Sequence, residues 1–255
     1  PTPDDLDEGE KFWEIVELKS FDCSHNKLDE LPSDWRAIST LRQLRVARNQ
    51  LGMLPEALLS DLPALELLDA GDNRLRSLPP VPAAGCALKT LLAPRNALEK
   101  LERWNVGECL TLETLSLSDN EGIKVLPALP KPLRALDVEN CGLQHLQPTQ
   151  FLETLAAARN KLKGVDVGGL QKLKYLDLRE NEIGAPGAKS LAAMMAVRAS
   201  LTSVGEDGLN LKCNRLGDEG WGAIFVAVCG SKESKITSID VSDEGIGIEG
   251  AKVIG

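Results

Sequence analysis

The sequence contains few aromatic residues, no run of basic residues and no long apolar stretch. Aromatic residues make up 4% of its 255 residues, so aliphatic side chains must supply most of the core. The 29 basic and 38 acidic residues give a net charge of −9. Nucleic acids and anionic membrane surfaces usually attract proteins with a basic face. We therefore expect neither of them as a partner.

A membrane span needs about 18–20 consecutive apolar residues. The longest apolar run, from Ala223 to Cys229, is too short, and no signal peptide follows Pro1. Membrane insertion is therefore not expected.

The cysteines do not form a metal-binding or disulfide pattern. None of the six lies in C-x-x-C spacing, and the chain has no N-x-S/T acceptor for a glycan although asparagine recurs throughout. Reduced thiols are typical of the inside of the cell. We expect an intracellular, cytoplasmic protein. The six are Cys23, Cys86, Cys109, Cys141, Cys213 and Cys229.

Catalytic residues are also scarce. His25 and His145 are the only histidines, and neither has a second ligand at metal-binding spacing. Ser24 is next to His25, but neighbouring strand residues point to opposite faces, so they do not form a nucleophile and its base. Carboxylates are numerous enough to supply the two acids of a glycosidase-like site. Such a site would exclude water poorly on an open sheet without enclosing loops, which disfavours it. We expect no enzyme activity, metal, cofactor or small-molecule ligand.

A repeated unit is what the sequence does contain. The segment LKYLDLRENEI fixes Leu173, Leu176, Leu178, Asn181 and Ile183 in the pattern L-x-x-L-x-L-x-x-N-x-L, which occurs ten times. Alternation along a strand places Leu176 and Leu178 on one face and Tyr175, Asp177 and Arg179 on the other. The asparagine positions of the ten units are Asn26, Asn49, Asn73, Asn96, Asn120, Cys141, Asn160, Asn181, Asn214 and Glu244.

This pattern resembles the leucine-rich-repeat family. The resemblance implies an α/β solenoid with a curved horseshoe shape, whose strands form a parallel concave sheet. It also implies that each asparagine amide bonds the backbone of adjacent repeats. A role in protein–protein interaction is the function class that it suggests.

The units come in two styles, which we assign to one domain over residues 18–255, preceded by an arm or cap over residues 1–17. Up to Asn181 they are short and many continue as Leu-Pro, which predicts an extended or 3₁₀ convex side. The segment around Trp13 resembles the early repeats of leucine-rich-repeat-containing protein 40. From about residue 184 the units read N-x-I-G-x-x-G-A and resemble the ribonuclease-inhibitor style, which implies a helical convex side and tighter curvature.

The segment Gly245 to Gly250 matches G-x-G-x-x-G, a dinucleotide-binding motif. Glycines occur at the same phase of the two preceding units, at Gly187 and Gly220. We therefore interpret these glycines as part of the repeat.

The repeat register also predicts which side chains face outward on the concave sheet. We expect Arg48 and Arg95 to pair with Asp72 between them, because adjacent parallel strands lie about 4.8 Å apart. Arginine and tyrosine are enriched in binding hot spots, which favours a partner-binding surface. The alternative is that these charges only pair with one another and keep the surface soluble. The candidate protein-binding residues are Arg45, Arg48, Asp69, Asp72, Arg95, Asp119, Asp137, Arg159, Tyr175, Asp177, Arg179 and Glu180.

These observations favour a non-catalytic scaffold that binds a partner protein on its concave face. The alternative is a recognition segment of a larger enzyme, or a structural subunit of a large assembly. Absent cysteine caps and glycan acceptors disfavour an extracellular receptor.

Overall fold

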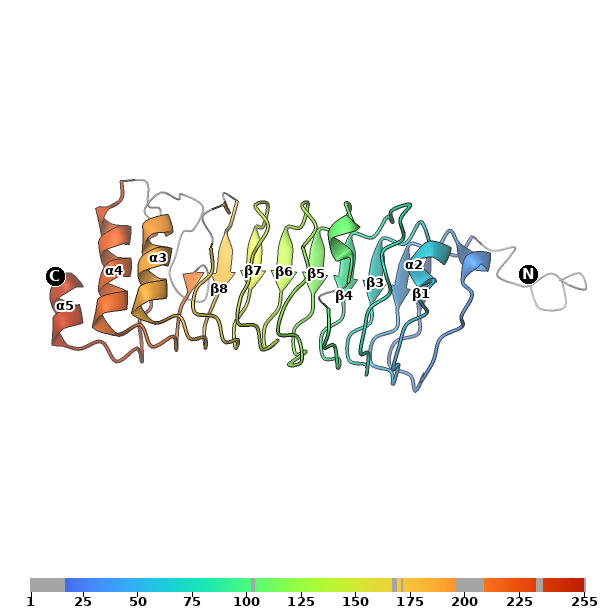
Figure 1. Ribbon diagram of the computed structural model, residues 1–255, viewed down its shortest axis with the longest axis horizontal. Coiled ribbons are helices and arrows are strands. Elements are labelled where there is room, and N and C mark those ends of the chain that lie inside the picture. The colour runs from blue at the N-terminus through green and yellow to red at the C-terminus, as the bar shows by residue number, and fades with distance from the viewer. Residues whose placement is uncertain are drawn as a thin grey trace, which may run out of the picture.

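The computed structural model describes residues 17–254, except 102–103, 167–168, 171, 196–208 and 233–235. The predicted arm over residues 1–17 lies outside this part but for Glu17. The described chain forms a parallel sheet of nine strands, each hydrogen-bonded to the next along the sequence (Figure 1). The strands are β1 (Ser20–Asp22), β2 (Gln43–Arg45), β3 (Leu67–Asp69), β4 (Thr90–Leu92), β5 (Thr114–Ser116), β6 (Ala135–Asp137), β7 (Thr154–Ala156), β8 (Tyr175–Asp177) and β9 (Leu209–Asn210).

The middle residue of each strand from β2 to β8 builds the core. Leu44 and Leu68 are directly paired across β2 and β3, and both side chains are fully buried. A strand of three residues has only one inward side chain, so it is stable only when stacked on its neighbours. The leucines of successive turns therefore form one continuous core, and the predicted register is confirmed.

The repeated asparagines join consecutive turns. The Asn49 side-chain oxygen accepts a hydrogen bond from the Leu28 amide (3.0 Å), while its Nδ2 donates to the carbonyls of Cys23 and Val46 (both 3.0 Å). One side chain thus satisfies backbone groups of two turns that would otherwise be buried and unpaired. The same arrangement recurs at Asn73, Asn96, Asn120, Asn160, Asn181 and Asn214.

Two turns replace the asparagine. Cys141 donates its thiol to the Leu117 carbonyl (3.2 Å) but offers no oxygen, and the Ile123 amide instead bonds Asn120 O within its own turn (3.0 Å). Glu244 accepts from the Cys213 amide (2.8 Å) and from the Trp221 indole (3.3 Å). Both residues therefore keep part of the ladder that asparagine supplies elsewhere.

The outer side of the solenoid changes along the chain as the sequence predicts. The early turns carry η2 (Arg36–Ile38), α2 (Leu58–Asp61) and η3 (Val106–Glu108), where α2 is a single α-helical turn rather than the expected extended or 3₁₀ segment. From Gly184 the outer elements are helices: α3 (Gly184–Met195), α4 (Gly217–Gly230) and α5 (Ile248–Ile254).

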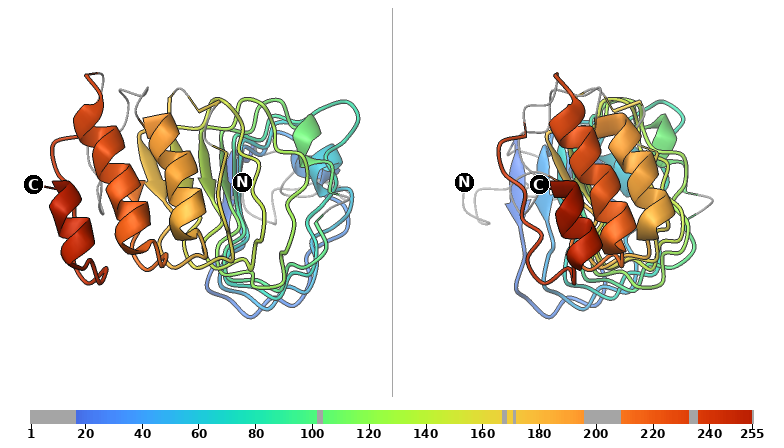
Figure 2. Two further views of the ribbon diagram at one scale, coloured as in Figure 1. Left: turned by 60° about the vertical axis from the view of Figure 1, so that its left-hand side comes forward. Right: turned by 90° about the vertical axis from the view of Figure 1, so that its left-hand side faces the viewer.

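The three C-terminal helices stand side by side at one end of the molecule (Figure 1). Seen along the long axis, the successive turns superimpose as one coil (Figure 2). Ala188 and Leu191 of α3 and Trp221 of α4 are buried in the core. No helix in the described part of the chain is long and apolar enough to cross a membrane.

Candidate binding surface on the concave sheet

The last residue of each strand forms the first column of the concave face. Arg45 in β2 is directly paired with Asp22 in β1 and Asp69 in β3, and all three side chains point away from the leucine core. This follows from strand alternation, because the preceding leucine points inward. The column contains Asp22, Arg45, Asp69, Leu92, Ser116, Asp137, Ala156, Asp177 and Asn210.

The residue before each asparagine position forms a second column, which has left-handed backbone torsions. Its φ angles lie between 50° and 62°, although none of these residues is glycine. From His25 to Glu180, the amide of each column residue donates to a backbone carbonyl of the next turn, such as that of Arg48 to Gly71 (2.9 Å). The repeat register predicts the positions of this column but not its left-handed backbone torsions. Its members are His25, Arg48, Asp72, Arg95, Asp119, Asn140, Arg159, Glu180, Cys213 and Asp243.

An ion-pair network joins three of these turns. The Arg95 guanidinium makes two hydrogen bonds to Asp72 (2.5 and 2.7 Å), and Arg48 approaches the same carboxylate from the other side (3.6 Å). The hydrogen bond from Arg95 is the main cause that lowers the pKa of Asp72, against a smaller opposing effect of burial. The predicted Arg48–Asp72–Arg95 grouping is confirmed.

These residues border an open hollow of about 450 Å³. Small or rigid residues, Ala47, Gly71 and Pro94, line it between the charged side chains. Arg45 and Asp69 also line it. Arg45 bonds the Gln43 side chain (3.0 Å) and Asp69 accepts from the Gly71 amide (3.1 Å), so neither belongs to the ion-pair network.

Hydrogen bonds, not ion pairs, connect the candidate residues of the central turns. Asp137 accepts from the hydroxyls of Ser116 (2.8 Å) and Ser118 (2.7 Å). Asp119 accepts from the Asn140 side-chain amide (3.0 Å). Both carboxylates are thus held in place by neighbouring turns.

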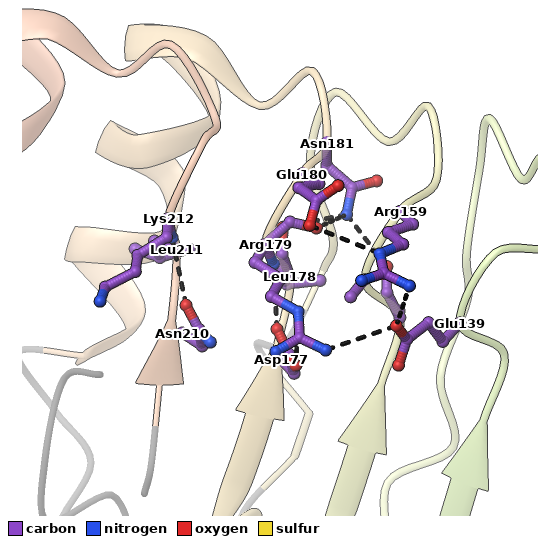
Figure 3. Close-up of polar contacts among 12 residues, drawn as sticks. Glu139, Arg159, Asp177, Leu178, Arg179, Glu180, Asn181, Asn210, Leu211 and Lys212 are labelled. Carbon is purple, nitrogen blue, oxygen red and sulfur yellow. Dashed lines mark hydrogen bonds and ion pairs between the residues drawn. The ribbon is translucent and has the colours of Figure 1, made fainter. Parts of the chain in front are cut away.

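A second charged network covers the later turns (Figure 3). Glu139 contacts both Arg159 and Arg179 at 3.4 Å, and Arg159 also reaches Glu180 at 3.4 Å. Arg179 spans from Asp177, at 3.5 Å, to Glu139 two turns away. The intervening turn carries Ala156 and Ala158, whose short side chains leave room for this reach.

Asp177 differs from the expectation of an exposed side chain. Only 3% of its side chain is exposed, because Arg179 lies beside it and Tyr175 OH lies 3.3 Å from its carboxylate. It supports the other side chains of the network instead of offering a contact of its own.

A third charged row at the beginnings of the strands escaped the sequence analysis. Glu66 lies between Arg42 (3.0 Å) and Lys89 (2.8 Å), and Glu153 lies between Arg134 (3.1 Å) and Lys174 (2.6 Å). The lysine in each case is the main cause that lowers the pKa of the glutamate. The detectable signal was the alternating charge at the first variable position of L-x-x-L. We call this the strand-entry row: Arg42, Glu66, Lys89, Glu113, Arg134, Glu153 and Lys174.

The described residues contain no cluster of three or more His, Cys, Asp or Glu side chains that could hold a metal ion. His25 borders the open hollow, and His145 is exposed. The amide of Gly247 donates to the Asp218 carboxylate (2.7 Å), so this amide is already hydrogen-bonded within the protein and is not free for a dinucleotide phosphate. This contact agrees with the interpretation of G-x-G-x-x-G as part of the repeat.

Comparisons with known proteins agree with this architecture. The family model described as Leucine Rich repeat matches residues 169–192 and 209–225. A comparison with curated proteins finds no match. The fold and the family match together show that the chain contains leucine-rich repeats stacked as a solenoid.

Solved structures of several leucine-rich-repeat proteins are similar to the chain. YopM from Yersinia enterocolitica is 31% identical with a TM-score of 0.55, and the match covers 66% of this chain and 34% of YopM. InlJ from Listeria monocytogenes is 26% identical with a TM-score of 0.57, covering 73% of this chain and 38% of InlJ. The chain thus spans little more than a third of either protein.

A third similar structure is that of TLR13 in complex with ssRNA13. It is 24% identical with a TM-score of 0.62, covering 78% of this chain and 30% of TLR13. At this identity the similarity concerns the fold alone.

Proposed function

We propose that the protein is a non-catalytic, intracellular scaffold that binds a partner protein across the concave face. The observation that carries this proposal is the second concave column. Ten side chains are held there at left-handed torsions, in register with the column of strand-end residues. Such a surface is rigid before binding, so little conformational entropy is lost when a partner associates.

The charges of the two columns define the chemistry of the partner. Arg45, Arg48 and Arg95 surround the open hollow, and arginine is enriched in binding hot spots. Asp240 and Asp243 at the other end are exposed and favour a basic segment. We therefore expect a partner with an acidic and a basic patch arranged along one surface, because complementary charges set specificity and association rate.

One observation supports the intracellular part of the proposal. All six cysteines are free, as is typical of proteins inside the cell.

The chain spans only about a third of YopM and InlJ. That coverage favours, as a second candidate, a recognition segment within a larger enzyme or a structural subunit of an assembly.

The test compares the wild-type chain with a variant in which Arg45, Arg48, Arg95 and Arg159 are changed to Glu. Each tagged chain is incubated with lysate of the native source, and co-purifying proteins are quantified by mass spectrometry. A partner that binds these arginines should be lost by about tenfold or more, since a single hot-spot arginine can contribute about 2 kcal/mol.

A matched control reverses Arg42 and Arg134, whose side chains are 59% and 56% exposed but belong to the strand-entry row. Equal capture by wild type and the concave variant would contradict the proposal, provided that both variants unfold at the same temperature. Binding of single-stranded RNA to the wild-type chain in a gel-shift assay would contradict the expectation of a protein partner.

The second candidate is distinguished by the length of the protein in its native source. An immunoblot with an antibody against these repeats would reveal a longer chain, and its sequence would then identify any catalytic domain.

A further inference from the structure

Two thiols from consecutive turns meet on the outer side of the solenoid. Cys86 lies two residues before Leu88, where the chain returns to β4, and Cys109 follows η3 on the way to β5. Their sulfur atoms are 3.1 Å apart. Cys109 is buried with 1% exposure, whereas Cys86 is only partly buried. The pair is therefore reached by solvent from the Cys86 side.

The backbone around both cysteines is fixed by bonds between the two turns. Thr111 Oγ1 lies within hydrogen-bond distance of the carbonyls of Cys86 (3.0 Å) and Leu88 (2.8 Å). Asn105, which begins η3, both donates to and accepts from the backbone of Val81 (2.8 and 2.9 Å). These contacts hold the two sulfurs together.

Cys141 provides a comparison within the same molecule. Its buried thiol contacts the carbonyls of Leu117 (3.2 Å) and Glu139 (3.6 Å), which satisfies a structural role in the ladder. Burial is the main cause that raises the pKa of Cys141, to about 12, so this thiol remains protonated and unreactive.

The Cys86–Cys109 pair differs from Cys141, because one of its thiols ionises more readily than a free cysteine. The hydrogen bond with the Cys86 thiol is the main cause that lowers the pKa of Cys109, and Thr111 adds a further bond. The same contact raises the pKa of Cys86. The contact therefore favours a thiolate on one sulfur while the other keeps its proton, and a thiolate is the reactive form of cysteine.

We propose that Cys86 and Cys109 form a redox-active dithiol that hydrogen peroxide converts to a disulfide between consecutive repeats. The thiolate attacks one peroxide oxygen, the O–O bond breaks and a sulfenic acid forms. The released hydroxide takes up the proton that this sulfur had lost on ionising and leaves as water. The second thiol then attacks the sulfenic sulfur, forms the S–S bond and releases another water. Two thiols thus lose two electrons and two protons, and one peroxide becomes two waters.

Bond formation needs an approach of about 1 Å by the two sulfurs. The disulfide would join the two turns on the outer side, away from the two concave columns. It therefore adds a covalent constraint to the scaffold, and it neither requires nor blocks the proposed binding to the concave face.

The test uses the full chain, first reduced and then exposed to an equimolar amount of hydrogen peroxide. Free thiols are blocked with iodoacetamide, and the chain is digested without reduction for mass spectrometry. We expect a cross-linked peptide that contains Cys86 and Cys109, is lighter by two hydrogen atoms and is separated by dithiothreitol. It should form about tenfold faster than any other cysteine pairing, because these two sulfurs are already in contact at 3.1 Å.

Matched variants locate the reaction. Cys86→Ser and Cys109→Ser should each abolish the cross-linked peptide, whereas Cys229→Ser should form it at the wild-type rate, since Cys229 is exposed elsewhere, in α4. Alkylation of both Cys86 and Cys109 in the peroxide-treated wild-type chain would overturn the proposal. So would preferential cross-linking through Cys213 or Cys229. The result for the wild-type chain does not depend on whether the variants fold.

Discussion

At the scale of single residues, Asn160 is where two turns depend on one side chain. Its Oδ1 accepts from the amides of Cys141 (3.2 Å) and Leu143 (2.9 Å), and its Nδ2 donates to the Val138 carbonyl (2.8 Å). Asn160→Ala would leave these groups buried and unpaired. We expect it to lower the free energy of unfolding by about 2–5 kcal/mol, measured by urea denaturation.

Asn26→Ala is the matched control for that measurement. Asn26 is exposed, and within the described part of the chain it bonds only the carbonyls of Cys23 and Ser24, in its own turn. Its loss should cost less than about 1 kcal/mol. Equal costs at the two positions would show that the bonds between turns are not what the asparagines contribute.

The positions of individual side chains were largely predictable, because the repeat fixes which residues face outward. The Arg48–Asp72–Arg95 network followed from that register alone. The burial of Asp177 did not, since it depends on how Tyr175 and Arg179 fold over it in three dimensions. The left-handed torsions before each asparagine also have no glycine to signal them.

At the scale of secondary-structure elements, α3 and α4 approach closely at Gly220. A Cβ atom there would lie 2.9 Å from Leu216 Cβ and 3.2 Å from both Ala185 Cα and Ala188 Cβ. Gly220→Ala should therefore push the helices apart and cost about 1–3 kcal/mol. Thermal unfolding followed by circular dichroism measures the effect.

Gly230→Ala, at the end of α4, is the corresponding control, because no atom lies within 4 Å of its added Cβ. We expect it to be neutral or to stabilise the helix by up to about 1 kcal/mol. A neutral result at both glycines would mean that α3 and α4 can separate without loss of packing.

The outer elements were predictable only where their own sequence is periodic. The alanine-rich pattern after Gly184 gave α3 because its apolar residues fall on one helical face. The contact between Cys86 and Cys109 could not be foreseen, since the early outer segments have no common register that would align them.

At the scale of the whole molecule, each turn contacts mainly its neighbours, so position along the solenoid determines what a core residue contributes. Leu115 is fully buried between β4 and β6, whereas Phe21 in β1 is 38% exposed and has one neighbouring strand in the described part of the chain. Leu115→Ala should cost about 2–5 kcal/mol of unfolding free energy. Phe21→Ala should cost less than half as much, although phenylalanine is the larger side chain.

Chemical denaturation of the two variants measures this difference. A larger loss for Phe21→Ala would indicate that the first turn, not the central stack, limits the stability of the molecule.

The side chains of the left-handed column can be exchanged while the backbone of each turn stays the same. A non-glycine residue in this conformation carries a strain of about 1–2 kcal/mol, which glycine would relieve. The protein nevertheless keeps charged or polar side chains at nine of the ten positions, with Cys213 at the tenth, while the backbone bonds of the turns from His25 to Glu180 do not involve those side chains. Successive repeats could therefore be reassigned individually, by evolution or by protein engineering, to match a new partner without altering the sheet.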